Sequence, residues 1–245
     1  MTNAIKKIFL FTAFFISIAL LTGCNMNKDN SSTTLREQMN KQQPVNTTEN
    51  YKVDKSDIIT GNELIKDVAK SAISEKEKAG LLQMREEEKL ARDVYLTLGK
   101  KWNMNIFSNI AKSEQTHTNA VKILLDRYSI KDPVADDTVG KFTSPTMQKL
   151  YTDLVAQGNS SLLSALTVGA IIEDLDIKDL DDFLKETDNE DIKITYNNLN
   201  KGSRNHLRAY IKNIKRNNGT YTPKYISQEQ FDKIILSAQE KGRVK

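Results

Sequence analysis

The sequence predicts an all-α protein whose main domain is a four-helix bundle. Four long segments place apolar residues at alternating spacings of three and four, which is the pattern of a helix buried along one face. Aromatic residues make up only 7% of the 245 residues and there are four prolines, so the chain lacks the residues that strands and tight turns need. The 36 basic and 32 acidic residues are interspersed and leave a net charge of +4, which gives no reason to expect a nucleic-acid partner.

The N-terminus has the pattern of a secretion signal. Two lysines precede an apolar run over residues 8–21, which is shorter than the roughly 20 apolar residues of a transmembrane helix. The run ends in Leu-Thr-Gly-Cys, which resembles the lipobox of bacterial lipoproteins. This resemblance implies a signal peptide over residues 1–23 and an acylated Cys24 that anchors an extracytoplasmic protein to membrane lipid. An uncleaved N-terminal anchor, or an ordinary signal with an incidental cysteine, are the alternatives.

The rest of the chain divides by composition. Residues 24–73 are expected to form a flexible polar tether, because residues 25–56 have almost no aliphatic side chains and cannot bury enough apolar surface to offset the entropy of ordering. Residues 58–72 are weakly helical and leave two alternatives open, a continuation of the tether or a segment that docks onto the following domain. The bundle is expected over residues 74–217. Residues 218–245 are expected to form a C-terminal extension that contains one short helix.

The first long helix is expected to begin after Ser74, because Ser74 and Glu77 have the spacing of a capping box. Its apolar face runs to Trp102 and is interrupted near the middle by Glu88. The adjacent residues 86–87 are expected to point away from this face.

The second long helix, with Asn105 as its expected N-cap, has the same kind of interruption. Glu114 and His117 lie in the middle of its apolar face and share that face because they are three residues apart. Residues 129–143 are then expected to form a loop, and Pro145 to open a short helix, since proline is favoured at the first helical position. Loop and short helix are long enough to cross the bundle, which favours a crossover over a simple array of hairpins.

The third and fourth long helices repeat the pattern. Glu173 and Asp176 interrupt the apolar face of the third, and Ser203 and His206 lie on the inner face of the fourth. Apart from Asp176, the acidic run over residues 176–182 is expected to face solvent.

These mid-helix polar residues are the candidate metal site. A carboxylate in a bundle core costs several kcal/mol unless it is paired or bound to a metal, and the nearby arginines are offset from the apolar faces. Because each residue lies about halfway along its helix, the side chains are expected to meet at one level. The candidate ligands of two divalent ions are Glu88, Glu114, His117, Glu173, Asp176 and His206. Tyr95, Tyr210 and Ser203 are expected around them, the tyrosines as core aromatics or, alternatively, in a redox role.

The same residues resemble known families. Ferritin-like di-iron carboxylate proteins use one Glu from each of two helices and a Glu-x-x-His motif from each of the other two. Here Glu114-Gln-Thr-His117 is one intact motif, whereas the fourth helix has Ser203 in place of the second glutamate. Asp176 either replaces that carboxylate or one metal position is weakened. The segment from Glu88 to Tyr95 is similar to the first helix of rubrerythrin-like members, and the stretches 86–95, 172–177 and 202–208 resemble the ferritin-like DUF2202 family over about residues 75–235.

The resemblance implies a di-iron or iron–manganese centre, with zinc as a further possibility, that oxidises Fe(II) or reduces peroxide. Sustained peroxide reduction would need an external electron donor, because the single cysteine cannot build a rubredoxin-type module. The missing glutamate at Ser203 favours an alternative, a non-catalytic metal-binding lipoprotein. A structural helical bundle without metal is a third hypothesis. The sequence does not fix the oligomeric state.

Overall fold

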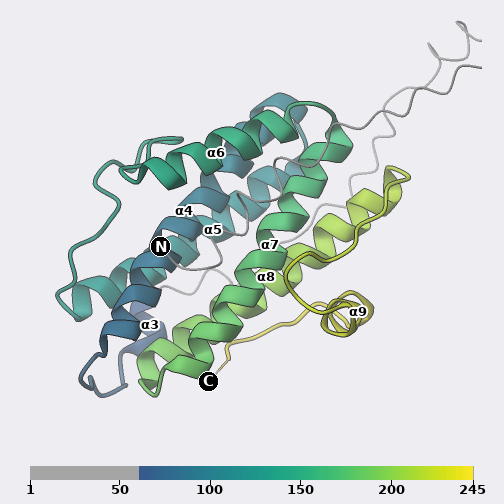
Figure 1. Cartoon of the computed structure of the whole chain (residues 1–245). Helices are drawn as coiled ribbons and strands as arrows, with labels where there is room; N and C mark the ends of the chain where they lie inside the picture. Colours follow the sequence, from purple (N-terminus) through teal and green to yellow (C-terminus); the bar gives the residue numbers. More distant parts are fainter. Residues whose placement is uncertain (1–60, 245) are drawn as a thin grey trace, which may run out of the picture. The chain divides into compact units, whose positions relative to one another are not determined.

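The computed structural model describes residues 61–244, and the helices run in the order shown in Figure 1. They are α3 (Gly61–Ile65), α4 (Glu75–Trp102), α5 (Asn105–Arg127), α6 (Pro145–Gly158), α7 (Leu162–Glu186), α8 (Glu190–Arg216) and α9 (Gln228–Leu236). No strand is present in this part of the chain, which confirms the predicted all-α class. Within these residues no helix has the length and apolar character needed to span a bilayer. The predicted signal peptide, Cys24 and most of the predicted tether lie outside the described residues.

The helices α4, α5, α7 and α8 pack as a four-helix bundle. In it, α4 packs against α5 and α7, and α8 packs against the same two helices. Along α4 the partners on α5 run in the reverse order, since Arg85 donates to Thr118 and Arg92, two turns later, donates to Gln115. Glu77, near the start of α4, accepts a hydrogen bond from Thr187 just after α7. Therefore α4 is antiparallel to both neighbours, and α5 and α7 run in the same direction.

Two parallel helices need a connection that returns along the bundle. Residues 128–144 and α6 provide it, and α6 packs against α4 and α7 (Figure 1). At the far end, Trp102 Nε1 donates to the carbonyl oxygen of Gly158 at 3.0 Å. The predicted crossover with a short helix is therefore present.

Most helix starts follow the sequence signals. Ser74 and Glu77 form both hydrogen bonds of a capping box, and Ser144, Ser161 and Ser227 cap α6, α7 and α9. The prediction for α5 was wrong by one residue. Asn105 is already the first residue of the helix, so Met104 is the N-cap, and its thioether side chain makes no cap hydrogen bond.

The predicted tether extends too far at its C-terminal end. Leu64 and Ile65 of α3 are buried in the core of the domain, and α3 packs against α5 and α8. Two adjacent aliphatic side chains supply enough apolar surface to hold this turn of helix on the bundle. Of the two alternatives for residues 58–72, docking therefore applies to residues 61–65.

The C-terminal extension also packs on the bundle. The buried carboxylate of Asp174 on α7 accepts hydrogen bonds from Tyr221 Oη at 2.7 Å and from the backbone N–H of Ile226 at 2.9 Å. Beyond α9, Glu240 forms ion pairs with Arg204 and Arg208 of α8. These contacts fix the extension along α7 and α8.

Candidate metal centre

Polar side chains from all four long helices meet halfway along the bundle. All are buried, and the most exposed of them, His117, has 4% of its surface accessible. They are Glu88 from α4, Glu114 and His117 from α5, Glu173 from α7, and His206 from α8. Five of the six candidate ligands therefore lie together, at one level, as expected from their mid-helix positions.

These five residues form two groups that share Glu114. In the first group, His117 Nδ1 lies 2.7 Å from Glu114 Oε2 and 3.3 Å from Glu88 Oε2. In the second, His206 Nδ1 lies 2.7 Å from Glu114 Oε1 and 3.4 Å from Glu173 Oε2. Each group places one potential ligand atom per residue within 4.8 Å of the others. One oxygen of Glu114 thus faces each group, which is the arrangement of a carboxylate that bridges two ions.

Local backbone geometry positions the imidazoles. Glu114 and His117 project from the same face of α5 because they are three residues apart. The His117 ring packs against Gly202 of α8, where an added Cβ would lie 2.5 Å from its Cε1 atom. The two imidazole rings are stacked with centroids 5.6 Å apart. Gly202 therefore leaves the space in which His117 lies.

The carboxyls of the group differ strongly in proton affinity. Burial raises the pKa of Glu88 to about 8 and that of Glu173 to about 7. Burial also acts against charge on Glu114, but His206 and His117 outweigh it and hold the pKa of Glu114 well below its usual range. Although burial opposes it, the carboxylates of Glu114 and Glu173 raise the pKa of His206 to about 10. The shared glutamate is thus the carboxyl that stays ionised.

The donor set fits divalent transition-metal ions. Three carboxylates with two imidazoles suit iron, manganese or zinc. Glu88 Oε1 is buried and makes no hydrogen bond to any residue that the structure describes. Leaving such an oxygen unsatisfied is costly, and a bound cation would satisfy it. The residues present therefore fit a metal pair.

The predicted surrounding residues contact the group in different ways. Tyr95 Oη donates to Glu173 Oε1 at 2.6 Å, and its ring lies against that of Tyr210 with centroids 5.4 Å apart. Ser203 Oγ donates to Asp176, which is partly exposed and belongs to neither group of three. Asp176 thus lies outside the close cluster of candidate ligands, and its hydrogen bond to Ser203 turns it toward α8.

Asp179 was expected to face solvent and is buried instead, and Glu87, which was expected only to point away from the apolar face of α4, is buried as well. Glu87 and Asp179 have exposed fractions of 8% and 5%. Gln83 Nε2 donates to Glu87 Oε1 at 2.9 Å and to Asp179 Oδ2 at 3.3 Å, across the α4–α7 interface. The i, i+4 spacing of Gln83 and Glu87 indicates that they share one face of α4, but it gives no signal that this face is covered.

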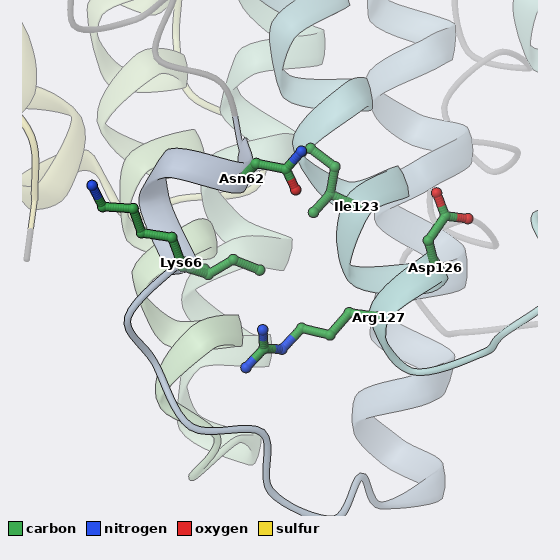
Figure 2. A pocket seen from close by; sticks show the side chains of 6 residues that line it. Asn62, Lys66, Ile123, Asp126 and Arg127 are labelled. Carbon is green, nitrogen blue, oxygen red and sulfur yellow. The ribbon is translucent and has the colours of Figure 1, made fainter.

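A pocket on the surface is a separate feature. Figure 2 shows this pocket, which lies between α3 and α5. Its volume is about 470 Å³. Its lining residues are Asn62, Ile65, Lys66, Ile123, Asp126 and Arg127. None of these is a candidate ligand, and Arg127 is engaged by Asp191 at 2.8 Å. The pocket therefore contributes nothing to the centre.

Comparison with known proteins identifies the family. Residues 77–238 match the family described as "Uncharacterized protein domain (DUF2202)". The chain belongs to the DUF2202 family. This DUF2202 protein is also 56% identical to the uncharacterized protein MJ0754 of Methanocaldococcus jannaschii over 180 residues, which are 74% of this chain and 97% of the relative.

A solved structure supports the fold. The crystal structure of the hypothetical protein MJ0754 from Methanococcus jannaschii is similar with a TM-score of 0.70 at 56% identity, covering 71% of this chain and 99% of that chain. The DUF2202 family predicted from the stretches around Glu88, Glu173 and His206 is confirmed by the match over residues 77–238.

Proposed function

We propose that this DUF2202 protein binds two divalent metal ions, iron in the first place and manganese or zinc as alternatives, and that it oxidises Fe(II) with dioxygen or peroxide. The observation that carries the proposal is the shared Glu114, which joins two buried groups that each contain one histidine and one further glutamate. The ferritin-like di-iron proteins use the same residue types from four helices.

Each side chain has a role that follows from its position. Glu88, Glu114 and His117 would hold one ion, and Glu114, Glu173 and His206 would hold the other, with Glu114 common to both groups. Tyr95 orients Glu173 through its hydrogen bond. The surrounding apolar core excludes bulk water. When bound, the metal pair supplies one-electron redox chemistry.

The overall reaction with peroxide balances without any further group from the chain. Two Fe(II) ions each lose one electron, and one hydrogen peroxide takes up these two electrons with two protons to give two waters. Continued peroxide reduction without fresh Fe(II) requires an external electron donor, because the chain's single cysteine is Cys24.

A non-catalytic metal-binding role is the second candidate. Ser203 occupies the position of the glutamate in the second Glu-x-x-His motif and donates to Asp176 rather than to either group. One carboxylate fewer lowers the charge available to hold a pair of ions, which favours capture of metal over turnover.

The first experiment is metal analysis of the full-length chain, purified without chelator and reloaded anaerobically with Fe(II). We expect two ions per chain, with a sharp fall in Glu114→Ala and His206→Ala and no change in the exposed control Glu229→Ala. Oxygen or peroxide consumption by the loaded protein then separates the two candidates, since a fully loaded protein that consumes neither is only a binder. An unchanged metal content in both variants would rule out the centre.

We also propose that acylated Cys24 attaches the protein to the outer face of a bacterial cell membrane. The lipobox-like sequence before Cys24 supports this attachment. Cells producing Cys24→Ser should release the protein from the membrane fraction and lose its lipid-derived mass. Membrane retention by this variant would contradict the proposal.

A further inference from the structure

The helices α4 and α8 finish at the end of the bundle where α5 and α7 begin. The Trp102 indole at the end of α4 donates to the carbonyl oxygen of Gly158 at 3.0 Å, shortly before α7. Near the start of α5, the centroid of the Phe107 ring lies 6.0 Å from that of Tyr210 in the last turns of α8. Segments that are far apart in the sequence therefore form one surface at this end.

This surface has basic residues of one sign of charge. The segments that form it contain no Asp or Glu, and they are residues 94–113, 154–172 and 207–228. We call this end of the bundle the basic end. Its exposed basic residues are Lys100, Lys101, Lys112, Lys212, Lys215 and Arg216.

Helix dipoles explain only part of this distribution. They favour cations in the last turns of α4 and α8, which hold Lys100 and Lys101, and Lys215 and Arg216. The same rule favours acids in the first turns of α5 and α7, and neither turn has one. Lys112 of α5 is also far from the C-terminal turn of its helix. The absence of acids from these segments therefore calls for another reason.

The opposite end of the bundle carries both signs of charge. The first turn of α4 holds the exposed Glu75. Lys76 pairs with Glu186 at 3.4 Å, and Lys185 pairs with Asp182 at 3.0 Å. The positive charge is therefore concentrated where α4 and α8 finish.

We propose that the basic end lies on the surface of an anionic lipid bilayer. Anionic headgroups attract lysine and arginine side chains that are close to the membrane. Trp102 is partly exposed among these residues, and Lys101 Nζ lies 5.1 Å from the centroid of its ring. Tryptophan is enriched at membrane–water interfaces, where its ring contacts the headgroup region. The ring and the charge together favour a lipid surface over a soluble anion.

This orientation is compatible with lipid attachment at Cys24, and its occurrence in the cell rests on that proposed attachment. The described chain begins at the opposite end, where Arg127 Nη2 donates to the carbonyl oxygen of Val68 at 2.5 Å. The 28 residues of α4 make it about 42 Å long. Residues 25–60 have a maximum extended length on the order of 120 Å, which is enough to let the basic end reach the membrane that holds Cys24.

The test uses the full-length protein as cells process it, purified with detergent and reconstituted on vesicles. Vesicles of phosphatidylcholine alone are compared with vesicles that also contain phosphatidylglycerol. Trp102 is the single tryptophan of the chain, so the quenching of its fluorescence by acrylamide measures how far the basic end is exposed to water. We expect quenching to decrease on the anionic vesicles only, and this protection to be lost at high salt.

Two matched double variants test which end of the bundle is responsible. Lys100→Gln/Lys215→Gln removes two exposed charges from the basic end and should lower the salt concentration at which the protection is half lost. Lys76→Gln/Lys185→Gln removes two exposed charges from the opposite end and should be protected like wild type. Equal quenching of wild type on both kinds of vesicle would overturn the proposal, and so would an unchanged salt midpoint in Lys100→Gln/Lys215→Gln.

Failure of the attachment through Cys24 gives a different result. An acylated protein should sediment with both kinds of vesicle, whatever their charge. If wild type sediments with the anionic vesicles alone and Trp102 is protected on them, the attachment through Cys24 is wrong and the basic end is supported. If wild type sediments with both but Trp102 is equally quenched, the attachment is supported and the basic end is wrong.

Discussion

At residue 202 the candidate centre depends on the absence of a side chain. An alanine Cβ there would lie 2.5 Å from Cε1 and 2.6 Å from Nε2 of His117, closer than such atoms approach. Alanine normally stabilises a helix interior by roughly 0.5–1 kcal/mol relative to glycine. Here we expect Gly202→Ala to destabilise the protein by about 1–3 kcal/mol through overpacking and to lower its metal content, because His117 must move. Urea unfolding and metal analysis measure the two effects.

The sign of the stability change is the decisive result for Gly202→Ala. A stabilised variant with full metal content would mean that His117 is not held against α8. Ala209→Gly, further along the same helix, is the reverse control. Its free energy of unfolding should fall by about 1 kcal/mol, the difference in helix propensity between alanine and glycine, and its metal content should be unchanged.

At the scale of elements, the sequence predicted those features of the helices that depend on spacing along a single helix. The capping box at Ser74 and the mid-helix positions of Glu88 and His117 depend only on local spacing. The prediction of a solvent-facing side chain failed for Asp179 because α7 packs against α4, α6 and α8 and is therefore buried on several faces. The outer face of α4 holds polar residues that pair locally, such as Lys89 with Asp93 at 2.5 Å. A polar face covered by neighbouring segments has the same sequence pattern as an exposed one.

Glu77 connects the start of α4 to the turn between α7 and α8, and its hydrogen bonds there predict that the stability of the protein depends on pH. It accepts hydrogen bonds from Thr187 at 2.5 Å and from Asn189 at 2.9 Å, at the turn between α7 and α8. Although burial opposes it, these bonds and those from Ser74 lower the pKa of Glu77 from 4.5 to about 2. A lowered pKa in the folded state stabilises the protein fully above pH 4.5, and this contribution disappears as the pH falls toward about 2.

We therefore expect Glu77→Gln to lower the free energy of unfolding by about 1–3 kcal/mol at pH 7. The difference from wild type should shrink between pH 4.5 and 2, as measured by urea unfolding at several pH values. Glu75→Gln, an exposed acid in the same turn, should show no such dependence. A constant difference across this range would mean that the Glu77 charge does not stabilise the helix junction.

At the scale of the whole molecule, the convergence of four helices was predictable because each polar interruption lies at the middle of its helix. The place of Asp176 was not, since a residue one turn from Glu173 can point either toward the centre or along the interface, and the choice depends on a hydroxyl from α8. The hydrogen bond from Ser203 to Asp176 settles it. Ser203, which stands where a second Glu-x-x-His motif would have its glutamate, is thus the hydrogen-bond donor to Asp176.

If the centre binds metal, the stability of the whole bundle depends on metal concentration. Each ion that binds only the folded chain adds about 2.7 kcal/mol at a free concentration 100 times its Kd, so added Mn(II) should raise the Tm of the chelated protein. Glu114→Ala/His117→Ala should lose this response, because it lacks the shared carboxylate and one imidazole. If the buried acids of the centre have only a structural role, the same variant should be as stable as wild type or more so. In that case added metal should change the Tm of neither protein. Thermal unfolding with chelator and with Mn(II), on both proteins, separates a metal-dependent fold from one in which these buried acids are only tolerated.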